Sequence, residues 1–489
     1  MKKFGNLNNR QAGALLPLSA LPGKHGIGDL GKSAYDFIEL IGVSGFKIWQ
    51  MLPLNPSAQG NSPYTPYSSF AGDYIYISLE LLVKDGLLDL VVEFNEEARR
   101  VDYENVRSFK DAYLRSAFAK FKLSKDAKLN DDYERFLRNA FWLDQYAAFM
   151  AVNLQQHGKP WPKWPQRILD DSLEEERNYQ KFLQFIFFRQ FEDLKTWAHY
   201  HDVALMGDIP FYVGLDSADV YFNRDCFLLD KNNEPLFVSG ASPDYFTDEG
   251  QLWGHPIYDW KHLEQTDYQY WVERLKWNGQ LFDILRIDHF RAFDTYWQVP
   301  AHEPTARNGK WIEGPGEDFF TKVVKVLPDL NIVVEDLGEL RDEVHQLRDR
   351  FKLMGMRIIQ YGFGENEQKE GYKVPKWSVA YSGTHDNNPI CGWEDELGIA
   401  QKFGIVEILD SFKYPGNNFC EKVYYRVFAC EANIAIVQVQ DILGLDGQAR
   451  FNLPGTVGDH NWTWKLTDLK ELENKVVETR RILKQTRRI

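Results

Sequence analysis

The feature that most constrains the fold is a recurring unit: a short apolar run, an abrupt polar or charged end, and then a helical pattern. The clearest runs are GFKIWQMLPLNP (45–56), VALMGDIPFYV (203–213), FDILRIDHF (282–290), LNIVVEDLG (330–338), GMRIIQYGF (355–363) and SVAYSGTHDNN (378–388). Continuous apolar runs between helices are typical of parallel strands that are buried on both faces. Several such units in series predict an α/β fold, either a (β/α) barrel or a doubly wound sheet.

The segments between these runs carry helical patterns. In residues 33–45, Ser33 is a suitable N-cap, and Gly42 or Gly45 is placed to end the helix. Within residues 181–200, four apolar side chains recur at spacings of four, three and four: Phe187, Phe191, Leu194 and Ala198. This spacing predicts one buried helix face, and a role in the core is a better interpretation than a cofactor site.

The length of the chain predicts insertions into the repeating fold. A barrel needs about 250 residues, whereas this chain has 489. Residues from about 81 to 200 are mostly helical in pattern and charged, so we expect a helical insertion there. Residues 214–262 are rich in loop signals and predict a second insertion. We therefore expect a single catalytic domain, 1–489, with these two additions.

Four acidic residues stand where predicted strands end: Asp208, Asp288, Glu335 and Asp386. In parallel α/β folds, ligands bind at the carboxyl ends of the strands, and in barrels that edge carries the active site. One such residue alone is often part of a structural ion pair. Four in succession, at intervals of 80, 47 and 51 residues, predict a shared site.

The neighbours of two of these carboxylates suggest different protonation states. Strand side chains alternate, so Arg286 and Asp288 point the same way, and the guanidinium favours an ionised Asp288 that can act as a nucleophile. Glu335 follows the apolar run NIVV, where burial raises the pKa and suits a general acid. Such a pair is typical of retaining glycoside chemistry, with a carboxyl separation of about 5 Å. The alternative is that Glu335 and Asp336 only cap the following loop.

Composition excludes several classes of function. The net charge of −14 argues against nucleic-acid binding and against docking on anionic lipid. The opening residues, MKKFGNLNNRQAG, contain no apolar core, so we expect neither export nor membrane insertion, and a cytoplasmic protein. The four cysteines have no metal-ligand spacing and are expected to be reduced thiols: Cys226, Cys391, Cys420 and Cys430.

We expect neither a metal nor an organic cofactor. The histidines lack regular ligand spacing, and a calcium or magnesium site built from the four carboxylates would not normally include Arg286. GIGDLG (26–31) matches the glycine pattern of dinucleotide-binding folds, but two prolines precede it and no acidic residue follows at the required distance. We interpret it as a tight turn and helix start.

The chain closely resembles 4-α-glucanotransferases of the amylomaltase (disproportionating enzyme) type, within the α-amylase-like superfamily. The resemblance runs over nearly the whole length and rests on these segments: GALLPLSALPGKHGIGDLG, WQMLPLNP, NSPYTPYSSFAG, GDIPFYV, PDYFTDEGQLWGHPIYDW, RIDHFRAF, VVEDLG, SGTHDNN and ARFNLPGT. It implies a (β/α)8 TIM barrel with insertions and without a separate C-terminal β-domain. Residues 214–262 would then contribute to a glucan groove.

The resemblance also implies roles for individual residues. Asp288 would be the nucleophile, Glu335 the general acid and base, and Asp386 the third carboxylate, which favours a distorted sugar ring. Ten further residues would bind substrate: Arg286, His289, His385, Asp208, Ser62, Tyr64, Asp244, Gln251, Trp253 and Asn452. The sequence departs from the family pattern at Ala292, around residues 56–64 and at Asp73. The resemblance therefore predicts the details of the groove less directly than the roles of the three carboxylates.

The function we expect is transfer of α-1,4-glucan segments between maltooligosaccharides by a retaining double displacement. The 15 Trp, 24 Tyr and 33 Phe suit a sugar cleft, although most of them must belong to the core. One alternative is an α-1,4-glucan hydrolase of the same superfamily, in which water replaces the acceptor sugar. A second is a non-catalytic glycan-binding barrel, against which the presence of all three carboxylates argues.

Overall fold

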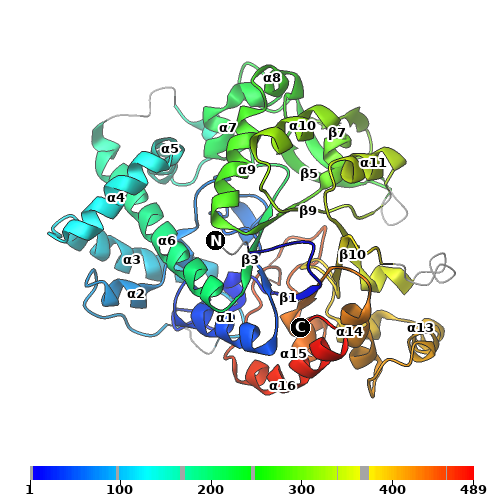
Figure 1. Ribbon diagram of the computed structural model, residues 1–489. Coiled ribbons are helices and arrows are strands. Elements are labelled where there is room, and N and C mark those ends of the chain that lie inside the picture. Colours follow the sequence, from blue (N-terminus) through cyan, green and yellow to red (C-terminus); the bar gives the residue numbers. More distant parts are fainter. Residues whose placement is uncertain are drawn as a thin grey trace.

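The central element of the computed structural model is a closed ring of eight parallel strands (Figure 1). The structure describes residues 4–94, 98–165, 171–243, 248–338, 340–363, 374–458 and 460–489. In spatial order the strands are β10 (Gly355–Ile358), β11 (Ser378–Tyr381), β12 (Ile434–Gln438), β1 (Gln11–Leu15), β2 (Ile48–Gln50), β3 (Ala204–Ile209), β6 (Ile284–Ile287) and β9 (Ile332–Val334). A parallel bridge between Val333 and Met354 joins the last strand to the first. The (β/α)8 barrel is therefore confirmed.

The six predicted strands are all present in the ring, and two strands of the ring, β1 and β12, were missed. β1 has the sequence QAGAL, whose small residues give little strand signal. A Cβ atom at Gly13 would lie 2.9 Å from the Cβ atom of Ile48 in β2, so the small residue allows the two strands to approach. β12, IAIVQ, is a continuous buried run that the same pattern could have identified.

Helices surround the ring, and some of them, such as α4 and α13, pack on other helices and not on the strands. Those before β3 are α1 (Lys32–Ser44), α2 (Leu79–Lys84), α3 (Tyr103–Phe121), α4 (Ala127–Asn139), α5 (Leu143–Gln155) and α6 (Glu174–Tyr200). Those after it are α7 (Ala218–Phe222), α8 (Trp260–Gln265), α9 (Gln269–Leu281), α10 (Gly316–Val326), α11 (Asp342–Arg350), α12 (Ile390–Glu396), α13 (Ile399–Ser411), α14 (Phe419–Ala429), α15 (Val439–Leu443) and α16 (Lys470–Gln485).

Two of the helix predictions have different outcomes. The apolar face of α6 is buried as expected, with Phe187, Phe191, Leu194 and Ala198 in the core. The start of α1 was wrong, because Gly31 and not Ser33 occupies the N-cap. Its end was right, since Gly45 adopts a left-handed conformation with φ of 102° and caps the helix.

A second, antiparallel sheet lies beside the barrel, with the strand order β5-β4-β7-β8. Its strands are β4 (Phe237–Ala241), β5 (Gln251–Pro256), β7 (Thr295–Pro300) and β8 (Lys310–Glu313). β4 and β5 come from the segment that was expected to be rich in loops. β7 follows the end of β6 after a short 3₁₀ turn, so this sheet lies next to the carboxyl-terminal edge of the barrel strands.

The glycine-rich motif at 26–31 has a packing role. A Cβ atom at Gly28 would lie 2.1 Å from the carbonyl oxygen of Leu18, so only glycine fits there. The neighbouring Asp29 accepts a hydrogen bond of 2.9 Å from Lys110, whose side chain is fully buried. The motif therefore joins the first turn of the barrel to α3, in agreement with its interpretation as a turn before α1.

The expectation of four reduced cysteines is wrong for one pair. Cys391 at the start of α12 and Cys420 at the start of α14 are joined by a disulfide, whereas Cys226 and Cys430 are free and buried. Cys391 and Cys420 are 29 residues apart in the sequence, and this separation did not indicate that they would pair. Within the part of the chain that the structure describes, no helix combines the length and the apolar character needed to cross a membrane.

Candidate active site

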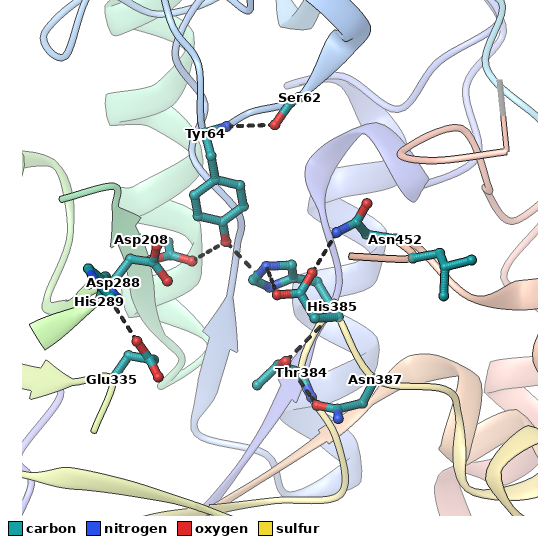
Figure 2. A network of polar contacts seen from close by, with 12 residues as sticks. Ser62, Tyr64, Asp208, Asp288, His289, Glu335, Thr384, His385, Asn387 and Asn452 are labelled. Carbon is teal, nitrogen blue, oxygen red and sulfur yellow. Dashed lines mark hydrogen bonds and ion pairs between the residues drawn. The ribbon is translucent and has the colours of Figure 1, made fainter. Parts of the chain in front are cut away.

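The barrel brings the predicted carboxylates to one edge. Asp208 lies near the end of β3, Asp288 directly follows β6, and Glu335 directly follows β9. These three strands are adjacent in the ring, and Asp208 pairs in register with Arg286. Asp386 lies five residues beyond the end of β11, and the preceding residue, His385, lies beside Tyr64 (Figure 2).

Arg286 is the electrostatic centre of the site. One terminal nitrogen, Nη1, donates to both carboxylate oxygens of Asp208 at 2.6 and 2.8 Å. The other, Nη2, lies 2.9 Å from Oδ1 of Asp288. The predicted pairing of Arg286 with Asp288 is confirmed. The carboxylates raise the pKa of the guanidinium, which outweighs the effect of its burial, so Arg286 stays charged.

Asp208 supports the site from behind. Its side chain has no exposed surface, and the Tyr64 hydroxyl donates to it at 2.7 Å in addition to the contacts from Arg286. Burial raises the pKa of Asp208, and the charge of Arg286 opposes that shift. The side chain of Asp288, by contrast, is 30% exposed and that of Asp386 is 44% exposed. Asp288 and Asp386 therefore face the solvent side of the site, whereas Asp208 holds Arg286 and Tyr64.

Glu335 occupies a different environment. Its Oε2 accepts a hydrogen bond of 2.8 Å from the His289 amide, and its Oε1 accepts one of 3.1 Å from the Leu337 amide. Burial, followed by the charge of Asp288, raises the pKa of Glu335 to about 7. The expected upward shift is therefore confirmed, and a large fraction of this carboxyl is protonated near neutral pH.

The alternative interpretation, in which an acidic side chain only caps the following loop, fits Asp336, the residue after Glu335. Asp336 is buried and takes hydrogen bonds from Arg348 at 2.6 Å and from the Met356 amide at 2.6 Å. Its carboxylate therefore fixes the segment between β9 and β10. Glu335 shares one loop contact, through Leu337, but its other oxygen faces the turn that follows Asp288.

The turn after Asp288 connects the two catalytic candidates. His289 has a left-handed backbone with φ of 49°, which directs its amide to the Glu335 side chain. The next amide, of Phe290, donates to the Glu335 carbonyl at 3.1 Å, and the Glu335 amide donates to the Ile287 carbonyl at 2.9 Å. Consecutive backbone groups therefore hold Asp288 and Glu335 in one relative position.

Asp386 is held by its own set of contacts. Asn452 donates to its Oδ1 at 2.6 Å, and Arg450 donates to its carbonyl at 2.5 Å. His385 Nε2 lies 3.4 Å from its Oδ2. The ring of His385 stacks on Tyr64 at 5.0 Å, which links the loop of Asp386 to the loop of Asp208 and Arg286 through the Tyr64 hydroxyl.

Aromatic side chains form the wall beside Asp288. The Trp253 ring on β5 stands edge to face against His289, with 4.9 Å between ring centroids. Burial lowers the pKa of His289 to about 4, so its imidazole is neutral near pH 7. Gln251 accepts a hydrogen bond of 3.2 Å from the Trp253 indole nitrogen. On the other side, Ser62 accepts from the Tyr64 amide at 3.3 Å.

The structure gathers most of the predicted site residues, and it adds others. Asp244 lies outside the described residues. Gln251 contacts the site through Trp253, and Ser62 contacts it through Tyr64. The sequence did not single out four residues of the site. Tyr212 lies against His289 with 6.2 Å between ring centroids, and Thr384 accepts a hydrogen bond of 3.3 Å from the Asp386 amide. The other two are Arg450 and Trp462. Trp462, with φ of 65°, lies 5.8 Å from His385 between ring centroids, and its place ten residues after Asn452 was the only available signal.

The described residues contain no cluster of three or more His, Cys, Asp or Glu side chains arranged to hold a metal ion. Instead, the polar groups of the site satisfy one another. The arrangement provides one carboxylate paired with a cation, one carboxyl that is partly protonated, and a third carboxylate fixed by an amide. That combination can perform acid-assisted nucleophilic substitution at an acetal carbon.

Comparisons with known proteins agree with this chemistry. The profile of the family described as 4-alpha-glucanotransferase matches residues 16–471. The chain is 40% identical to the 4-alpha-glucanotransferase of Clostridium butyricum, covering 95% of this chain and 99% of the relative. It is 38% identical to that of Aquifex aeolicus, covering 96% and 98%.

A solved structure gives the same result. The amylomaltase of Streptococcus agalactiae in complex with acarbose superposes with a TM-score of 0.93 at 31% identity, covering 98% of this chain and 99% of that one. The matches in sequence and in structure both extend over nearly the full length. The chain therefore belongs to the 4-alpha-glucanotransferase family.

Proposed function

We propose that the site transfers α-1,4-glucan segments between maltooligosaccharides by a retaining double displacement, with Asp288 as nucleophile and Glu335 as general acid and base. The observation that carries the proposal is the opposite environments of these two residues. Arg286 lies 2.9 Å from Asp288, whereas burial raises the pKa of Glu335 to about 7. Two neighbouring carboxyls in different protonation states are what this reaction requires.

In the first displacement, a carboxylate oxygen of Asp288 attacks the anomeric carbon of the donor. Glu335 gives its proton to the glycosidic oxygen as the bond to the leaving glucan breaks. The products are a β-glycosyl ester on Asp288, a shortened glucan with a new hydroxyl, and an ionised Glu335. The adjacent Arg286 contact stabilises the aspartate before the attack and after its release.

In the second displacement, Glu335 accepts the proton of the 4-hydroxyl of an acceptor glucan. The acceptor oxygen then replaces Asp288 at the anomeric carbon, and two inversions restore the α configuration. Asp386, held by Asn452, accepts hydrogen bonds from sugar hydroxyls and favours the flattened ring of the transition state. His385 and Tyr64 bound the same subsite, and Asp208 positions Arg286 and Tyr64.

A hydrolase of the same superfamily would use the same residues, with water as the acceptor. The wall formed by Trp253 and His289 beside Asp288 supports sugar as the acceptor, because apolar ring faces bind a sugar and exclude water. We also propose that residues 1–489 form one catalytic domain. In it, the region of about 81–200 is a helical insertion and 214–262 contributes to the glucan groove.

Incubation with maltotriose tests the function directly. Product lengths and total reducing ends are followed together. We expect glucose, maltopentaose and longer chains, while the number of reducing ends stays constant, because each transfer consumes one reducing end for each that it releases. Reducing ends that rise steadily would identify a hydrolase. Absence of any new product would reject catalysis by this site.

A further inference from the structure

A hollow lies on the outer wall of the barrel, and the proposed reaction does not use it. Helices α1, α2 and α6 surround it, with a volume of about 750 Å³. α1 and α6 pack against each other and are neighbours in Figure 1. Three aromatic side chains line the hollow: Tyr35 from α1, and Trp197 and Tyr200 from α6.

The outer face of α6 supplies the aromatic surface. Arg189, Asp193, Trp197 and Tyr200 are spaced by four, four and three residues, so they share one face of the helix, away from the buried phenylalanines. The rings of Trp197 and Tyr200 are 5.6 Å apart at an angle of 22°, and Tyr35 lies 5.9 Å from Trp197. Tyr200 is 78% exposed, which is unusual for so large a ring.

The Trp197 ring is held in place by a hydrogen bond. The indole nitrogen of Trp197 donates to the Tyr35 carbonyl at 3.1 Å, which holds its ring against the first turn of α1. Trp197 in turn supports Tyr200 by stacking. Trp197 and Tyr200 therefore form a stacked pair at the surface, and the Tyr35 ring lies beside them at 46° to Trp197. Because Trp197 is already held in place, binding a ligand does not carry the entropic cost of ordering that ring.

The charges around the hollow cancel. Among its lining residues, Lys32, Lys84 and Arg189 are balanced by Glu80, Asp85 and Asp193. Arg189 and Asp85 form a two-bond ion pair of 2.9 and 3.2 Å. A lining of net charge zero does not favour a phosphate, a nucleotide or a charged peptide. It offers donors and acceptors beside a flat apolar surface, which suits a neutral, polyhydroxylated ligand.

The hollow is separate from the active site. Tyr200 ends α6, four residues before β3 begins at Ala204, so it lies toward the amino-terminal edge of the barrel strands. The catalytic candidates lie at the opposite, carboxyl-terminal edge. From Arg189 to Tyr200 the helix rises about 17 Å, so the hollow extends along the wall and has room for several sugar rings.

We propose that this hollow is a non-catalytic binding site for an α-1,4-glucan chain. The rings of Trp197 and Tyr200 stack against the apolar faces of the sugars, and Arg189 with Asp85 forms hydrogen bonds to their hydroxyls. The site keeps a polymer attached to the enzyme between transfers. The chemical class of the ligand rests on the proposed function, because the protein acts on this polymer at its other site.

Affinity electrophoresis in native gels containing glycogen tests the proposal. We expect glycogen to retard the wild-type protein and Tyr200→Ala to weaken the apparent affinity about fivefold, since it removes a stacking partner. Tyr200→Phe keeps the ring and should retain the retardation. Phe403→Ala, which removes a 68% exposed ring on α13, is the matched control and should also retain it. Turnover of maltotriose should be the same in all four proteins.

The outcomes separate the two proposals. If Tyr200→Ala is retarded as strongly as the wild type, or if the wild type is not retarded while it disproportionates maltotriose, the wall site is rejected and the proposed function stands. If maltotriose gives no products, the proposed function fails on its own. If Tyr200→Ala changes only the elution volume in size-exclusion chromatography, the surface joins copies of this chain, and the glucan site is rejected.

Discussion

The raised pKa of Glu335 gives a quantitative prediction for the pH dependence of the reaction. The first displacement needs the protonated form, and burial together with the Asp288 charge places the pKa of this group at about 7. The protonated fraction then falls from about 0.9 at pH 6 to about 0.1 at pH 8. We expect kcat/KM for maltotriose to fall about tenfold over this interval if the first displacement limits it.

The assay needs a substrate that separates protonation from other pH effects. A maltosyl fluoride donor has a leaving group that departs without a proton, so its first displacement should lose the alkaline decline. His289 does not account for the decline, because burial lowers its pKa to about 4. Glu335→Gln should lower turnover of maltotriose by about 10²- to 10⁴-fold and leave ester formation from the fluoride much less affected.

The role of Asp288 in this pKa can be measured apart from turnover. Asp288→Asn removes the charge that, after burial, contributes most to the upward shift. Infrared difference titration of the Glu335 carboxyl should then give a pKa below that of the wild type. The reasoning would be refuted by a kcat/KM for maltotriose that is constant from pH 6 to 8, or by a Glu335 pKa that does not fall in Asp288→Asn.

Four further changes have defined outcomes. Glu335 binds a proton more tightly in the folded protein than in the unfolded chain, so wild-type stability falls as pH rises from about 4.5 to about 7. The Tm of Glu335→Gln should therefore rise relative to that of the wild type between pH 5 and pH 8. A difference in Tm that stays constant over this interval would contradict the prediction. Asp288→Asn should reduce maltotriose turnover by more than about a thousandfold, and near-full activity would exclude Asp288 as the nucleophile. Asn452→Ala removes the 2.6 Å contact to Asp386 and should lower kcat about 10- to 100-fold with an unchanged Tm. Lys110→Ala leaves Asp29 buried without its cation, and denaturant unfolding should show a loss of about 3–5 kcal/mol, which a loss below about 1 kcal/mol would contradict.

The apolar runs predicted six of the eight barrel strands because these strands are buried on both faces, whereas the choice of a barrel over a doubly wound sheet followed from the family resemblance. Burial on both faces produces continuous apolar runs, which are visible without any knowledge of tertiary structure. The same reasoning located Asp288 and Glu335, since each directly follows such a run. β1 escaped detection because close approach to β2 requires Gly13, and a glycine among small residues carries no strand signal.

Contacts between distant segments could not be predicted in this way. The burial of Asp208 depends on Tyr64 and Arg286, which lie 144 and 78 residues away in the chain. The placement of Trp462 beside His385 likewise depends on how distant loops meet. The pairing of Cys391 with Cys420 depends on how α12 packs against α14. The N-cap of α1 was misplaced for a local reason, since Ser33 offers a hydroxyl but the chain turns at Gly31.

The backbone connection between the turn at His289 and Glu335 has an evolutionary consequence. Asp288 and Glu335, the proposed nucleophile and acid, are joined through the main-chain amides of His289 and Phe290, and every residue other than proline supplies such an amide. Substitutions in the surrounding loops can therefore change which glucans bind, while Asp288 and Glu335 keep their relative position. If 214–262 contributes to the glucan groove as proposed, exchange of this segment for that of a relative should change the preferred chain length and leave the chemical step unchanged.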